Sequence, residues 1–105
     1  MAVYRLPVGS LRVVNGVRYD RTTTVAFEGD ELAVREKMID AEGPQGFTET
    51  LYYPADRRLL VHLVNWYKRR GEMTTYVLTE VSRKDLQAGG RFEDLAIGAW
   101  AWLRT

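Results

Sequence analysis

The sequence predicts an α+β domain: an antiparallel, hairpin-rich sheet of about five to seven strands, a helix at the C-terminus and, in one interpretation, a second helix within residues 55–70. Three observations support this fold class. Apolar and polar residues alternate over several stretches, turn-forming residues separate these stretches, and the last segment has helical spacing. The alternative is a mostly β meander or small barrel with the same C-terminal helix.

The clearest strand covers residues 17–27. Its β-branched and aromatic residues recur at every second position on one side, which indicates a half-buried antiparallel strand. Asn15-Gly16 precedes this segment, and both residue types tolerate the positive φ angles of a type I′ hairpin turn. Gly29-Asp30 follows it and predicts a second tight turn.

Three further segments are assigned to strands. Residues 31–39 are rich in helix-forming residue types, but their apolar side chains form no single helical face. Most of these side chains share one face of a strand, so a strand is favoured. Residues 47–53 and 73–82 show the alternation and the β-branched content of sheet segments.

Residues 57–70 fit either a helix or a strand. Wound as a helix, the segment has an apolar stripe and an opposite stripe made of Arg58, His62, Asn65 and Arg69. As a strand, the continuous apolar run 59–67 suits burial on both faces. The helical periodicity favours the helix slightly.

The C-terminal segment predicts a helix after Gly89-Gly90. Acidic residues in its first turn complement the helix dipole. The apolar residues that recur at helical spacing are Phe92, Leu95, Ala96, Ala99, Trp102 and Leu103. A strand is the alternative, because residues 99–102 also alternate small and large side chains.

Length and composition limit the class of protein. A chain of 105 residues with 46% hydrophobic and 28% charged residues predicts one globular domain over residues 1–105. The absence of Cys excludes disulfides, thiolate catalysis and Cys-based zinc sites. No apolar run approaches the roughly 20 residues of a membrane span, and no secretory signal is evident. We therefore expect a cytoplasmic protein with no membrane partner.

Catalytic and cofactor motifs are also missing from the sequence. It contains no phosphate-binding P-loop, no dinucleotide fingerprint, no EF-hand loop and no His-Glu-x-x-His motif. His62 is the lone histidine. We therefore expect no cofactor, no metal and no catalytic residue, although the pattern leaves open a site built from carboxylates alone.

The charged residues cluster although the formal net charge is only +1. Residues 28–42 carry six carboxylates, whereas residues 57–70 carry five cations and no carboxylate. Three Trp, six Tyr and three Phe also exceed what a core of this size comfortably hides. Opposite patches and surplus rings predict contact with another molecule, most simply a second copy of the chain.

These patterns lead to three functional hypotheses. The first is a non-catalytic binding domain that acts as a homodimer or larger homo-oligomer. The second is a nucleic-acid-binding protein that uses the basic aromatic segment 57–70. The third is a domain with an aromatic-lined pocket for a small apolar molecule. The candidate binding residues are Arg58, His62, Asn65, Trp66, Arg69 and Arg70.

Overall fold

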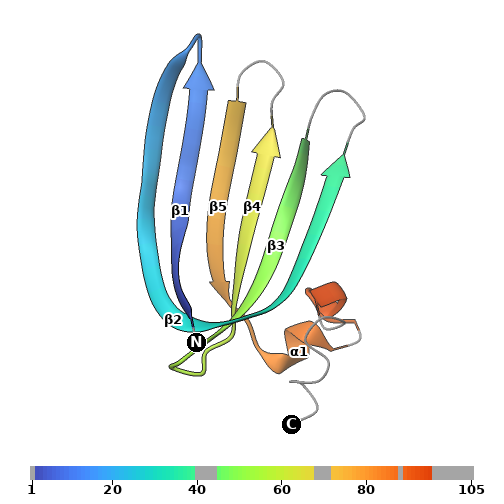
Figure 1. Ribbon diagram of the computed structural model, residues 1–105. Helices are drawn as coiled ribbons and strands as arrows, with labels where there is room; N and C mark the ends of the chain where they lie inside the picture. The colour runs from blue at the N-terminus through green and yellow to red at the C-terminus, as the bar shows by residue number, and fades with distance from the viewer. Residues whose placement is uncertain (1, 40–44, 68–71, 88, 96–105) are drawn as a thin grey trace.

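A computed structural model describes residues 2–39, 45–67, 72–87 and 89–95. Five antiparallel strands close into a barrel in the order β1-β2-β3-β4-β5, and a short helix and a 3₁₀ turn follow (Figure 1). The mostly β alternative therefore describes the fold better than the α+β class. The elements are β1 (Ala2–Val14), β2 (Val17–Ile39), β3 (Gln45–Pro54), β4 (Leu60–Tyr67), β5 (Glu72–Glu80), α1 (Arg83–Leu86) and η1 (Glu93–Leu95).

Strand β2 closes the barrel because it pairs with two different neighbours. Its first half pairs with β1 and its second half with β3, so Figure 1 shows β2 at both outer edges of the sheet. Gly29 lies where the partner changes, opposite both Ala2 and Pro54. A Cβ atom there would stand 2.5 Å from the Tyr53 carbonyl oxygen. The predicted turn at Gly29-Asp30 is therefore wrong: the glycine permits a bend within one continuous strand.

Several local predictions are confirmed. Asn15 and Gly16 have φ angles of 51° and 77° and join β1 to β2 as a tight turn. The segments 31–39, 47–53 and 73–80 are strands. Ser82, by contrast, lies beyond β5 and caps α1, where its backbone N–H donates to Asp85 Oδ2 at 2.8 Å.

The predicted helix within residues 55–70 is wrong, because its central part forms β4. This strand has β3 on one side and β5 on the other, so its backbone groups are bonded along both edges. Val61 and His62 are only 1% and 6% exposed although they point to opposite faces. A segment buried on both faces has a continuous apolar run, and such a run also imitates helical periodicity.

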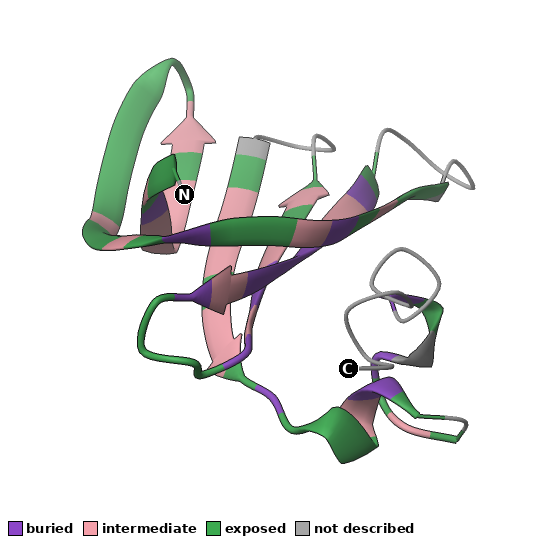
Figure 2. Cartoon of the chain, turned by 60° about the horizontal axis from the view of Figure 1, so that its bottom comes forward, coloured by how far each residue is buried: buried purple, intermediate pink, exposed green. Residues whose placement is uncertain are grey.

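The barrel has two packing layers. In one layer, the rings of Tyr4, Phe27 and Tyr52 pack with centroids 4.8–5.7 Å apart. Outside, α1 and η1 cover one end of the sheet (Figure 2). The buried residues of this second layer are Ala33, Leu51, Leu59, Val61, Val81, Leu86, Phe92 and Leu95. Where the structure describes the predicted C-terminal helix, it has a turn and the 3₁₀ turn η1 instead of an α-helix. Phe92 and Leu95 are nevertheless buried, as the predicted apolar stripe requires, and residues 96–105 lie outside the described residues.

The first half of β2 differs from the prediction of a half-buried strand. Val17, Tyr19 and Val25 share the predicted apolar side, yet they are 52%, 54% and 37% exposed. Outside the sheet, η1 contacts β2 and β3, and α1 contacts η1. Both elements lie near the end of the sheet away from the β1–β2 turn (Figure 1). A large part of the outer sheet surface is thus left without a covering element among the described residues.

Candidate functional site

The exposed side of the sheet can be reconstructed from the strand register. Residues directly opposite one another in an antiparallel ladder point to the same face. Tyr19 lies opposite Arg12, Arg12 opposite Met73, Met73 opposite Tyr67, and Tyr67 opposite Gln45. One row of side chains therefore crosses all five strands.

A second row lies two residues further along each strand. It comprises Arg21, Ser10, Thr75, Asn65, Phe47 and Lys37, in order from the first half of β2 to its second half. With strands about 4.8 Å apart, this row follows roughly 24 Å of the sheet. We call the two rows together the open face. They lie toward the end of the sheet away from α1 (Figure 1).

Two adjoining hollows are lined largely by these side chains. The larger hollow, of about 490 Å³, is lined by Ser10, Arg12, Val14, Tyr19, Arg21 and Met73. The smaller, of about 140 Å³, is lined by Gln45, Gly46, Phe47, Asn65, Trp66, Tyr67, Met73 and Thr75. Met73 belongs to both. The larger hollow therefore lies on the open face, whereas the smaller one also includes Trp66, which points to the other side of β4.

The open face carries positive charge that is not neutralised locally. Its cations are Arg12, Arg21 and Lys37, and none of them forms an ion pair with any residue that the structure describes. Neither row contains a carboxylate. Charge on this face is therefore available to an external anion.

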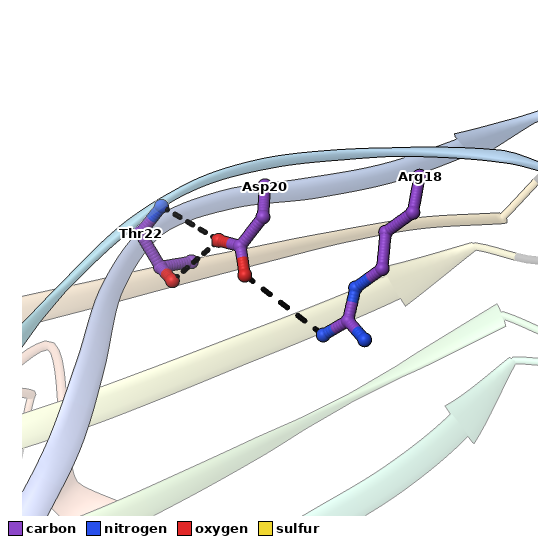
Figure 3. Close-up of polar contacts among 3 residues, drawn as sticks. All are labelled: Arg18, Asp20 and Thr22. Atoms are coloured by element: carbon purple, nitrogen blue, oxygen red, sulfur yellow. Dashed lines mark hydrogen bonds and ion pairs between the residues drawn. The ribbon is translucent and has the colours of Figure 1, made fainter.

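The nearest acidic residues are neutralised or turned away. Glu49, in the next row, is buried and lies 3.1 Å from the Arg35 guanidinium. Asp20 lies between Tyr19 and Arg21 in sequence, so it points to the other face of β2. There it accepts hydrogen bonds from the Thr22 hydroxyl at 2.6 Å and from the Thr22 N–H at 3.0 Å (Figure 3).

The same Thr22 contacts shift the titration of Asp20. The hydroxyl hydrogen bond and then the N–H hydrogen bond lower the pKa of Asp20, and the Arg18 guanidinium at 3.8 Å lowers it further. Asp20 therefore stays ionised at neutral pH, but its charge is directed at Arg18 and Thr22 and not at the open face.

Aromatic rings stand among the cations of the open face. Tyr19 and Tyr67 are 54% and 38% exposed, and Phe47 is half-buried beneath the Arg35 guanidinium, 5.2 Å from the ring centroid. Amide and hydroxyl groups of Gln45, Asn65, Ser10 and Thr75 complete the two rows. The arrangement combines flat apolar surfaces, positive charge and hydrogen-bonding groups.

The structure separates the candidate residues that the sequence grouped as a helical stripe. Arg58 is exposed before β4 and pairs with Asp56 and Glu80. His62 is buried inside the barrel, where its Nε2 donates to the Pro7 carbonyl oxygen at 2.8 Å and its ring stacks on Tyr76.

Of the remaining candidates, Asn65 lies in the second row of the open face, and Trp66 points to the opposite side of β4 and packs on Gly46. Arg69 and Arg70 lie outside the described residues. Whether these residues bind a ligand stays a prediction. No sequence pattern singled out Arg12, Tyr19 and Lys37 as candidate binding residues. Only the alternation over residues 17–27, which places Tyr19 and Arg21 on one side, pointed toward the open face.

Other classes of site have no counterpart in the part of the chain that the structure describes. No group of three or more His, Asp or Glu side chains there could hold a metal ion. No described helix has the length and apolar content to cross a membrane. Comparison with protein-family models, curated proteins and solved structures finds no match in any of the three.

Proposed function

We propose that this protein is a binding domain whose ligand is an anionic polymer that lies along the open face. The observation that carries the proposal is the set of three cations without a carboxylate in two rows of side chains across the whole sheet. Because the net charge of the whole chain is only +1, the positive potential is concentrated at the open face and does not cover the whole surface.

The spacing of the cations favours a polymer over a small anion. Arg12 and Arg21 are diagonal neighbours on β1 and β2, roughly 7–8 Å apart at the backbone, so one anionic group can contact both. Lys37 lies at the far end of the same row as Arg21, about 24 Å along the sheet. That separation exceeds the Debye length of about 8 Å at physiological salt. Only an extended anion can use all three cations.

The proposal is tested by titrating the full chain with three polyanions: heparin, a DNA duplex and a single-stranded oligonucleotide. We expect binding to weaken steeply with salt, because bound counterions are released. Arg12→Gln/Arg21→Gln should reduce the slope of log K against log salt by about 1.4 for a single strand, at about 0.7 per lost phosphate contact.

The matched control removes two cations elsewhere. Arg5→Gln/Lys84→Gln changes the net charge equally, and both side chains are exposed outside the open face. We expect the control to retain the slope of the unmodified chain. Failure of every polyanion to bind at low salt would refute the proposal.

A second candidate function, self-association through the same face, is favoured by the apolar side chains around it. Val17, Val25, Met73 and Val77 are each at least 37% exposed. A two-fold interface would also bring like charges toward one another, which opposes it. Light scattering that gives a concentration-independent mass of 12.1 kDa would exclude this candidate.

The third hypothesis, a pocket for a small apolar molecule, has weaker support. Arg12 and Arg21 line the larger hollow, and guanidinium groups suit an anionic ligand better than an apolar one.

A further inference from the structure

We propose that the anionic polymer is single-stranded nucleic acid, whose unpaired bases stack on Tyr19 and Tyr67 while its phosphates contact Arg12, Arg21 and Lys37. This inference rests on the proposed function and names the ligand of the same face. The observation behind it is separate from the charge: two exposed tyrosine rings lie on either side of Arg12 in the first row.

The rings are placed where they are accessible to a ligand. Tyr19 lies directly opposite Arg12, and Tyr67 is three strands away in the same row, roughly 14 Å along the sheet. Stacking of bases on aromatic rings tolerates any base, because every base has a flat face. A chain that carries both negative charges and flat rings suits a row in which Arg12 lies between Tyr19 and Tyr67.

The width of the open face disfavours a duplex. The DNA major groove is about 12 Å wide and admits a helix or a two-stranded ribbon. The open face spans five strands over roughly 24 Å, so it does not fit into a groove. Bases of a duplex also present only their edges, so Tyr19 and Tyr67 would have nothing to stack on. A single strand exposes the base faces that these rings require.

The larger hollow provides a place for one nucleotide of the strand. Its volume of about 490 Å³ lies within the usual range of ligand sites. Arg12 and Arg21 flank it, and planar guanidinium groups can each donate two hydrogen bonds to a phosphate. Tyr19 lines the same hollow, so a phosphate and its base can be held together.

Asn65 and Gln45 can add hydrogen bonds to base edges. Both side chains are exposed: Gln45 lies directly opposite Tyr67 in the first row, and Asn65 lies in the second row. Amide groups offer a donor and an acceptor, so they can satisfy more than one base. We therefore expect a modest base preference and not strict sequence recognition.

The experiment compares three labelled or competing probes in fluorescence anisotropy: an oligothymidylate of about 15 nucleotides, which exceeds the reach of the open face, its duplex with oligoadenylate, and heparin. The variants are Tyr19→Leu and Tyr67→Leu, which keep apolar area but remove the ring. The matched controls are Tyr19→Phe and Tyr67→Phe, which keep the ring. Far-UV circular dichroism and thermal melting establish that each variant is folded.

We expect the unmodified chain to bind the oligothymidylate more tightly than the duplex. Each Leu variant should bind the oligothymidylate on the order of 5- to 150-fold more weakly, while its affinity for heparin stays within about twofold. The Phe variants should retain the original affinity.

Two results would overturn the inference in different ways. Equal affinity for the single strand and the duplex, with no effect of the Leu variants, would refute single-strand binding but leave an anionic-polymer ligand in place. No binding of any probe would refute both proposals. If a Leu variant does not fold, the comparison of single strand with duplex on the unmodified chain still decides the question.

Discussion

The guanidinium of Arg35 reaches the carboxylate of Glu49 across the β2–β3 ladder, with Nη1 3.1 Å from Oε1. The same Nη1 lies 3.3 Å from Asp94 Oδ2, and the guanidinium also lies over the Phe47 ring. Arg35 therefore connects η1 to the sheet and stands at the boundary between the helix-covered part and the open face.

Loss of Arg35 should destabilise the fold. Arg35→Met leaves the buried Glu49 carboxylate without its cation, and we expect a loss of about 1–3 kcal/mol in the free energy of unfolding. Urea denaturation measures it. Arg58→Met, which breaks two exposed ion pairs, should cost less than about 1 kcal/mol. Equal effects of the two substitutions would contradict the role assigned to Arg35.

A side chain at Gly29 should be poorly tolerated. The Cβ of Gly29→Ala would meet the backbone of Tyr53 and Pro54, which cannot rotate away, so we expect a cost of about 1–3 kcal/mol. Ala26→Val on the same strand is the control, because this exposed position should change stability by less than about 0.5 kcal/mol. A thermal melt of Gly29→Ala that matches the unmodified chain would argue against a close bend at this residue.

The lowered pKa of Asp20 predicts a pH dependence. Ionised Asp20 contributes stability above its ordinary pKa of 3.8, and the contribution disappears as the pH falls through the lower folded-state pKa. The stability difference between the unmodified chain and Asp20→Asn should therefore shrink in acid. Carbon NMR of the carboxyl group measures the pKa directly, and Thr22→Val should raise it because the hydroxyl donor is removed. A pKa that Thr22→Val does not change would show that another contact is responsible.

His62 should matter for stability and not for ligand binding. His62→Leu removes the donor to the part-buried Pro7 carbonyl, so we expect a loss of about 1–3 kcal/mol in the free energy of unfolding. His62 points away from the open face, so the folded His62→Gln variant should bind the oligothymidylate like the unmodified chain from pH 5.5 to 8. A change in affinity confined to the acidic part of that range would instead indicate that His62 makes ligand binding depend on pH.

Local patterns were sufficient for much of the sheet. The Asn15-Gly16 turn follows from the positive φ angles that these two residues tolerate. The strands within residues 31–39, 47–53 and 73–80 follow from their apolar and polar alternation. These features depend on neighbours in the chain, so the amino-acid order was enough to find them.

Three other features of the structure depend on which strands pair with one another. Residues 57–70 satisfy both helical and strand patterns, and only the flanking β3 and β5 select the strand. Gly29 suits a turn as well as a bend, and closure of the barrel through both edges of β2 selects the bend. Arg12, Tyr19 and Tyr67 form one row because of register, a relation between distant segments that no local periodicity contains.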